Sequence, residues 1–109
     1  MRDEIHRVAC EAVRNAFKHA EAQRIDVELR YEKRQFRLRV RDDGKGIDQA
    51  VLNGSGRERH FGLPGMQERA RVAGGKLAVF SRPGAGTEVE LTIPASFAYK
   101  KAAASGRGA

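Results

Sequence analysis

Residues 3–20, with the sequence DEIHRVACEAVRNAFKHA, decide the fold because they predict one amphipathic helix. Asp3 is a suitable N-cap, and Glu4 follows in the first turn, where the helix dipole favours negative charge. Apolar residues recur at the three- and four-residue spacing of one helix face. These residues are Ile5, Val8, Ala9, Ala12, Val13, Ala16, Phe17 and Ala20. The helix is therefore expected to bury one face against a second layer of structure.

A polar stripe of Glu11, Asn15 and His19 borders the apolar face of this helix. At about 100° per residue, these three positions lie on one line, each roughly 40° on from the last. A carboxylate, an amide oxygen and an imidazole on a pocket wall can serve as a base, a hard-metal ligand and a phosphate contact. Polar residues at a helix border are more commonly just solvated, so the stripe gains meaning only from the motifs that follow it.

Two alternating segments after the helix, RIDVELRY at 24–31 and QFRLRVRD at 35–42, predict a β-hairpin. The apolar residues of each segment share one face: Ile25, Val27, Leu29 and Tyr31 in the first, and Phe36, Leu38 and Val40 in the second. The register that pairs Tyr31 with Phe36 keeps these residues together and sets opposite charges across the hairpin. The charged pairs in that register are Glu28 with Arg39 and Asp26 with Arg41. The arginine-rich strand is therefore expected to be a solvated sheet face and not a nucleic-acid site.

The rest of the chain completes a two-layer arrangement. Residues 42–47 (DDGKGI) break the second strand, 48–61 are expected to form a mobile loop, 62–73 a second helix, and 76–81 and 87–93 two further strands. The order helix, hairpin, loop, helix, hairpin predicts an α/β two-layer sandwich, with helices on one face of a mainly antiparallel mixed sheet. We expect one domain over residues 1–94 and a disordered tail over residues 95–109.

The composition permits one folded domain and argues against several function classes. A chain of 109 residues, 40% of them hydrophobic, can bury a core without disulfides, and its single cysteine, Cys10, excludes an internal disulfide. Cys10 is expected to be a buried, inert thiol. The N-terminus lacks a signal-peptide pattern, so we expect a cytoplasmic location. The net charge of +7 is spread along the chain without an interleaved aromatic stripe, and no apolar run could cross a bilayer. We therefore expect no nucleic-acid partner and no direct membrane contact.

Three glycine-rich segments follow the polar stripe: DDGKG at 42–46, GLPG at 62–65 and GAGT at 84–87. Each alone is typical of a turn, but their order after EAVRNAFKHA (11–20) is more informative. Over nearly its whole length the sequence resembles the ATP-binding catalytic domain of bacterial two-component sensor histidine kinases. That domain belongs to a superfamily shared with DNA gyrase, a heat-shock chaperone and the mismatch-repair ATPases. EAVRNAFKHA resembles the N box, DDGKGI and GLPGM two glycine boxes and GAGTEVEL the last. The run at 60–94 resembles the nitrate/nitrite-type subgroup. The resemblance implies the ATP-binding fold of this superfamily.

The resemblance also implies a site for ATP and Mg²⁺. Asn15 would hold Mg²⁺ through its amide oxygen, and Glu11 would act as the catalytic group, a base or a polariser toward the attacking group. Asp42 would accept a hydrogen bond from the adenine amino group, a contact that guanine does not offer, and the hydroxyl of Thr87 would lie nearby. The remaining implied nucleotide-binding residues are Lys18, His19, Gly44, Gly46, Ile47, His60, Gly62, Leu63, Gly65 and Met66.

Two features of this implied site leave alternatives open. Arg57, Arg59 and His60 lie in the expected lid, where each is a phosphate contact or a plain solvated loop residue. Asp43 stands where many relatives carry asparagine, so any contact that depends on an amide there is in doubt.

The resemblance implies that the chain is part of an enzyme, a protein histidine kinase, in a longer parent protein. It leaves open whether that parent protein is anchored to a membrane. In this family the acceptor histidine lies on a separate dimerisation domain, and a response regulator then takes the phosphoryl group. Nothing in this chain resembles that domain, and His6 is expected to be structural, so the chain alone should bind ATP with little turnover. The alternatives are an anti-sigma-factor-type serine kinase, a non-catalytic nucleotide-binding adaptor and a basic nucleic-acid-binding module.

Overall fold

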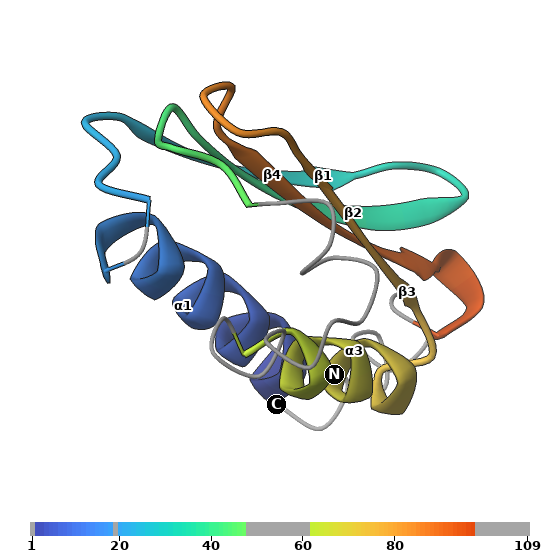
Figure 1. The fold of residues 1–109 in the computed structure, drawn as a ribbon. Coiled ribbons are helices and arrows are strands. Elements are labelled where there is room, and N and C mark those ends of the chain that lie inside the picture. Colours follow the sequence, from blue (N-terminus) through green and yellow to red (C-terminus); the bar gives the residue numbers. More distant parts are fainter. Residues whose placement is uncertain (1, 19, 48–61, 98–109) are drawn as a thin grey trace.

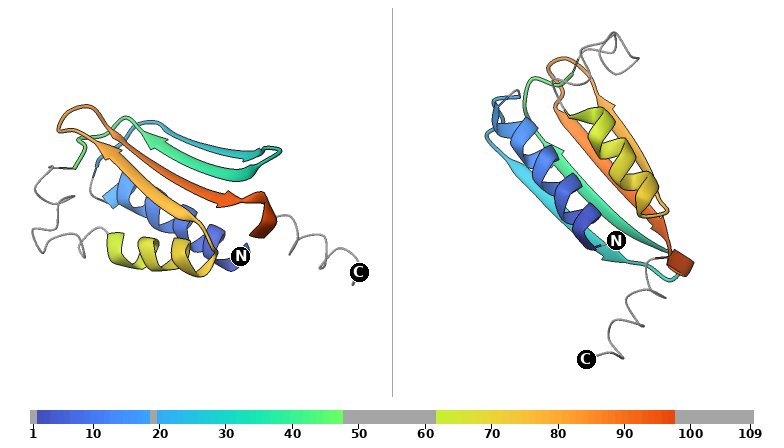
Figure 2. Two further views of the ribbon diagram at one scale, coloured as in Figure 1. Left: turned by 90° about the vertical axis from the view of Figure 1, so that its right-hand side faces the viewer. Right: turned by 90° about the horizontal axis from the view of Figure 1, so that it is seen from below.

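The computed structural model describes residues 2–18, 20–47 and 62–97, which form two helices packed on a four-stranded sheet. In chain order the elements are α1 (Arg2–Lys18), β1 (Ile25–Tyr31), β2 (Gln35–Asp42), α3 (Leu63–Val72), β3 (Lys76–Ser81) and β4 (Thr87–Pro94). Both helices lie side by side on one face of the sheet (Figures 1 and 2). The predicted two-layer α/β sandwich is confirmed, and every strand pair among the described residues is antiparallel.

Helix α1 ends two residues before the predicted end at residue 20. Glu21 adopts a left-handed conformation with φ of 52°, which stops a helix. The N–H groups of Ala20 and Ala22 donate to the carbonyls of Asn15 and Ala16, each at 3.1 Å. Along the helix Val8, Ala12 and Ala16 are buried, as the apolar spacing predicted.

The strand order β1-β2-β4-β3 places β2 and β4 at the centre of the sheet. The predicted hairpin register is confirmed: Tyr31 is opposite Phe36, Glu28 opposite Arg39 and Asp26 opposite Arg41. The central strands supply much of the core against the helices. Its buried members include Val8 and Ala12 of α1, Met66 and Ala70 of α3, and Leu38, Leu91 and Ile93 of the sheet.

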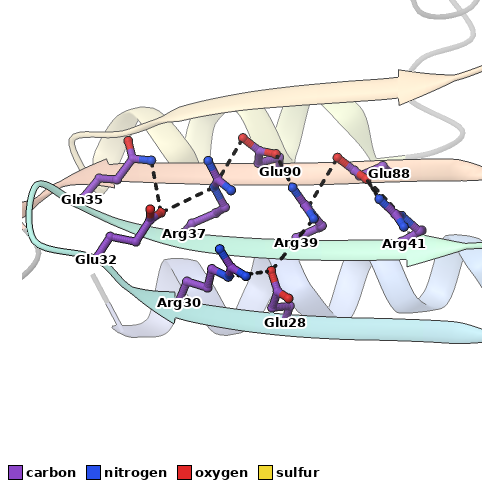
Figure 3. A network of polar contacts seen from close by, with 9 residues as sticks. All are labelled: Glu28, Arg30, Glu32, Gln35, Arg37, Arg39, Arg41, Glu88 and Glu90. Carbon is purple, nitrogen blue, oxygen red and sulfur yellow. Dashed lines mark hydrogen bonds and ion pairs between the residues drawn. The ribbon is translucent and has the colours of Figure 1, made fainter.

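The face of the sheet opposite the helices carries a network of ion pairs (Figure 3). Arg39 of β2 lies 3.6 Å from Glu88 and 3.8 Å from Glu90, both on β4. Arg41 lies 2.9 Å from Glu88, and Arg37 lies 3.8 Å from Glu90. The arginine-rich strand is thus a charged outer sheet face, as predicted. Of the predicted cross-hairpin pairs, Arg39 lies 4.0 Å from Glu28, but the arginines pair chiefly with Glu88 and Glu90 of β4, pairings that were not predicted from the sequence.

Strand β1 departs from the expectation that both hairpin strands bury their apolar residues. Val27, Leu29 and Tyr31 are 53, 52 and 76% exposed, although Val40 and Leu38 opposite the first two are buried. The cause is the strand order, because β1 is an edge strand and the helix layer lies mainly over its neighbours.

The second half of the sequence follows its predicted elements closely. Helix α3 begins after Gly62, and its Leu63, Met66 and Ala70 are buried. Strand β4 includes Pro94, one residue beyond the prediction. Residues 95–97 form a short helical turn, whereas the loop predicted at 48–61 and the tail from residue 98 lie outside the described residues. Neither described helix has the length and apolar character needed to cross a membrane.

Candidate functional site

A cavity between α1, the start of α3 and the sheet brings together residues from all four predicted motifs. Its lining is Ala12, Asn15, Ala20, Val40, Asp42, Gly46, Ile47, Leu63, Val79, Thr87 and Val89. Most of these side chains are apolar, and the polar groups come from Asn15, Asp42 and Thr87. Such a lining, mainly apolar with a few convergent polar groups, is typical of small-molecule sites. The cavity itself is small, with a volume of about 20 Å³.

Asp42 is the charged group of this cavity. It ends β2 two residues after Val40, so its side chain faces the helix layer, and the residue is only 8% exposed. Its Oδ1 atom accepts a hydrogen bond from the N–H of Gly44 at 2.8 Å. This contact fixes the carboxylate at the cavity wall.

Two residues of the polar stripe of α1, Asn15 and Glu11, line different pockets. Asn15 lines the cavity, and its Oδ1 atom is shielded from solvent. Glu11, one turn earlier, lines a neighbouring groove between α1 and α3 together with Gly62 and Gly65. A Cβ atom on Gly62 would lie 2.4 Å from Glu11 Oε1, so the start of α3 packs directly on this carboxylate. His19 lies outside the described residues.

Two of the motif glycines are required by close backbone packing within the chain itself. A Cβ atom on Gly44 would lie 2.4 Å from the carbonyl oxygen of Ala20. Gly46 has a φ of 80°, and its Cβ would lie 1.9 Å from the carbonyl oxygen of Arg82. Only glycine fits these positions without displacing backbone, so both residues hold the first glycine box against its neighbours.

Ser81 is a buried residue of the site that sequence reasoning missed. Its Oγ atom accepts the N–H of Ile47 at 2.6 Å and donates to the carbonyl of Gly86 at 2.9 Å. It also lies 2.8 Å from Thr87 Oγ1. One hydroxyl thus joins two of the motifs that line the cavity. The only sequence signal for this role was a small polar residue at the end of a strand, just before a glycine-rich turn.

Asp43 has a structural role outside the cavity. Its Oδ1 atom accepts the N–H groups of Arg24 at 3.0 Å and Gln23 at 2.9 Å. The hydrogen bond from Arg24, then that from Gln23, holds the pKa of this exposed carboxyl below its ordinary value. An aspartate at this position therefore ties the segment before β1 to the end of β2.

The start of α3 presents backbone N–H groups without a side-chain cap. Gly62 is the N-cap residue, with a left-handed φ of 69°, and its carbonyl accepts the N–H of Met66 at 3.0 Å. Pro64 follows in the first turn, and a Cβ atom on Gly65 would contact nothing within 4 Å. Leu63 lines the cavity, whereas Met66 packs in the core and borders the groove.

Several predicted residues are not brought into the cavity. Lys18 is exposed at the end of α1, and Arg57, Arg59 and His60 lie outside the described residues. Cys10, predicted to be buried, is exposed, because it lies well away from the inward face of α1 that Val8 and Ala12 define. Its Sγ atom lies 3.5 Å from Nε2 of His6, which is also exposed. No cluster of three or more His, Cys, Asp or Glu side chains suited to a metal ion occurs in the described part of the chain.

The fold agrees with what comparison with known families finds. Residues 1–96 match the model of the family described as histidine kinase-, DNA gyrase B- and HSP90-like ATPases. The chain belongs to this ATPase family. The match extends from the start of α1 past the end of β4, and so includes every described element of the sheet and the helix layer.

Two curated kinases and one solved ATP-binding domain are similar to this chain. It is 36% identical over 90 residues to the histidine-protein kinase/phosphatase DegS of Brevibacillus brevis, covering 83% of this chain and 22% of DegS. It is 37% identical over 92 residues to the sensor histidine kinase LiaS of Bacillus subtilis, covering 84% of this chain and 24% of LiaS. The ATP-binding domain of PrrB from Mycobacterium tuberculosis shares the fold, with a TM-score of 0.72 at 21% identity over 86% of this chain and 68% of that one. The chain thus spans about a quarter or less of the length of these curated relatives.

Proposed function

We propose that this chain is the ATP-binding catalytic domain of a two-component sensor histidine kinase, of the nitrate/nitrite-type subgroup. The observation that carries the proposal is that Asn15, Asp42 and Thr87, from three separate motifs, line one cavity. The subgroup assignment rests on the resemblance over residues 60–94. Family membership supports ATP as the nucleotide.

Asp42 and Thr87 would recognise adenine. Asp42 is held at the cavity wall by Gly44 and carries an acceptor-only carboxylate, which suits the amino group of adenine and opposes the carbonyl of guanine. Thr87 is held beside it by Ser81. The apolar side chains of Ile47 and Leu63 supply contact area for a planar base.

Asn15 fits the role of a magnesium ligand. Mg²⁺ takes oxygen ligands, commonly only one or two of them from protein, and completes its shell with phosphate oxygens and water. A shielded amide oxygen beside the cavity meets this need. When bound, the ion would neutralise phosphate charge during phosphoryl transfer. The uncapped N–H groups at the start of α3 suit phosphate oxygens, and Lys18, His19 and His60 are the side chains we assign to the same role.

Glu11 is the proposed base, and its position in the groove beside the cavity suits a group that meets the acceptor instead of the nucleotide. The acceptor would be a histidine of a dimerisation domain in the parent protein, and the product would be passed to a response regulator. His6 and Cys10 lie in the same groove but carry no role in this proposal.

Calorimetric titration of the chain with ADP and a non-hydrolysable ATP analogue, each with and without Mg²⁺, tests the proposal. Asp42→Asn keeps an oxygen for the N–H of Gly44 but changes what the base meets, so it should weaken ADP binding at least about tenfold and reduce the preference over GDP. Asn15→Ala should remove the magnesium dependence of binding, whereas Asn15→Asp, which retains an oxygen ligand, should keep it.

Matched variants separate these effects from general damage. Asp26→Asn removes a carboxylate from the exposed outer sheet face and should leave ADP affinity unchanged. Glu11→Gln should also bind ADP normally, because Glu11 does not line the cavity. A folded chain that binds no adenine nucleotide would overturn the proposal in favour of the adaptor, and transfer to a protein serine would favour the anti-sigma-factor-type kinase.

A further inference from the structure

Three polar side chains lie in one row across the end of the sheet that borders the cavity. In the strand register, Thr87 of β4 is opposite Asp42 of β2 on one side and opposite Ser81 of β3 on the other. Asp42 and Thr87 line the cavity, and Ser81 Oγ lies 2.8 Å from Thr87 Oγ1. Residues directly opposite each other in antiparallel strands have Cβ atoms about 4.5–5.5 Å apart. The hydroxyl of Thr87 therefore has two polar neighbours to which it could give its single proton.

The other partners of Ser81 decide where the proton of Thr87 goes. The N–H of Ile47 can only donate, and Ser81 Oγ accepts it at 2.6 Å. The carbonyl of Gly86 can only accept, so its contact of 2.9 Å takes the one proton of the Ser81 hydroxyl. The contact of 2.8 Å between the two hydroxyls then requires the proton of Thr87. None is left for the Asp42 carboxylate on the other side of Thr87.

We propose that Ser81 is a positioning residue that sets the hydrogen-bond direction of Thr87 and thereby makes the cavity prefer a 6-aminopurine. Because Ser81 accepts its proton, the Thr87 hydroxyl offers only lone pairs to the cavity. The Asp42 carboxylate also offers only lone pairs, so this wall accepts hydrogen bonds at two neighbouring points. The inference rests on the proposed function, because it takes a purine nucleotide as the occupant of the cavity.

The chemistry at position 6 of a purine gives this arrangement its consequence. Adenine carries an amino group there, with two N–H donors, whereas guanine and hypoxanthine carry a carbonyl oxygen, which is an acceptor. A carbonyl that faces two fixed acceptors loses its hydrogen bonds to water without replacement, and such a mismatch is rejected strongly. Without Ser81, the Thr87 hydroxyl could turn its proton toward the Asp42 carboxylate or toward a 6-oxo group. Both changes would weaken the preference for adenine.

Calorimetric titration of the full chain with ADP and with inosine diphosphate tests this inference. The two nucleotides differ only at position 6 and in the proton on the adjacent ring nitrogen, so the ratio of their dissociation constants reports on contacts there. Ser81→Ala should reduce the preference for ADP about fivefold, the contribution of one hydrogen bond. Thr87→Val, which removes the hydroxyl at nearly unchanged volume, should reduce it by a similar factor. Thr92→Val is the matched control, because Thr92 lies on the outer face of the same strand, and it should leave both affinities unchanged.

A double variant separates the positioning role from general loss of structure. Ser81→Ala also removes the partner of Ile47 and Gly86, so loosening of the cavity could weaken both nucleotides equally. In a Thr87→Val background Ser81→Ala should leave the ratio of the two dissociation constants unchanged, because no hydroxyl remains to be directed. Ser81→Thr, which keeps a hydroxyl, should retain the wild-type ratio.

The outcomes distinguish this inference from the proposed function. If wild type prefers ADP, an unchanged preference in either single variant, or a further loss of preference in the double variant, would overturn the role of Ser81 and leave the proposed function standing. A wild-type chain without a preference for ADP would overturn this inference together with the assignment of Asp42 to adenine.

Discussion

The two glycines of the β3–β4 turn offer a sharp test of how Asp42 is positioned. Gly84 and Gly86 have nearly the same left-handed φ, 79° and 81°, but different surroundings. A Cβ atom on Gly84 would contact nothing within 4 Å, whereas one on Gly86 would lie 2.1 Å from the carbonyl oxygen of Asp42. Alanine at either position therefore has the same conformational cost, but only Gly86→Ala also has a steric cost.

The magnitudes follow from these contacts. The left-handed conformation costs an alanine about 1–2 kcal/mol, and the lower entropy of the unfolded chain returns about 0.4–1 kcal/mol. Gly84→Ala should therefore lower the free energy of unfolding by about 0–1.6 kcal/mol. Gly86→Ala must also move the Asp42 carbonyl by more than an ångström to reach ordinary contact, which begins at 3.4 Å. Overpacking of this kind adds about 1–3 kcal/mol.

Urea unfolding followed by circular dichroism measures both variants, since the chain has no tryptophan for fluorescence. Gly86→Ala should be less stable than Gly84→Ala by about 1–3 kcal/mol, with similar slopes against urea. It should also bind ADP more weakly, because the displaced backbone carries Asp42. Equal stability of the two variants would refute the reasoning that the turn packs against the end of β2.

Two further predictions concern the residues that hold the site together. Ser81→Ala should lower the free energy of unfolding by about 2–3 kcal/mol, because the buried N–H of Ile47 and the carbonyl of Gly86 lose their partner. Ser96→Ala, at an exposed serine, is the matched control. Equal effects of the two variants in urea titrations would contradict this role of Ser81. For Asp43, the folded-state pKa lies below the unfolded value near 3.8, so its stabilisation is complete above that pH and is lost as pH falls through the folded-state pKa. Asp43→Asn does not titrate, so the gap in urea midpoint between wild type and variant should be constant near neutral pH and narrow below about pH 4; a constant gap throughout would contradict this role.

The hairpin register could be predicted from sequence because its determinants are local. Alternation assigns each side chain of β1 and β2 to a face, and the pairing of Glu28 with Arg39 fixes which residues lie opposite each other. Burial of β1 could not be predicted in the same way, because it depends on the order of the strands in the whole sheet. Alternation states that Val27 and Leu29 face the helices, but not that β4 pairs with β2 and leaves β1 at the edge.

The candidate site shows the same division between local and tertiary information. The order of the motifs predicted that Asn15, Asp42 and Thr87 belong to one site, and they line one cavity. The helix spacing correctly predicted that Glu11 and Asn15 lie on one side of α1. It could not predict whether their side chains line the same pocket. Gly62 at the start of α3 packs against Glu11, and both line the groove and not the cavity. Glu11, the proposed base, thus faces a groove that an acceptor could reach while a nucleotide occupies the cavity. This arrangement follows from the packing of α1 on α3, so the sequence of either helix alone could not predict it.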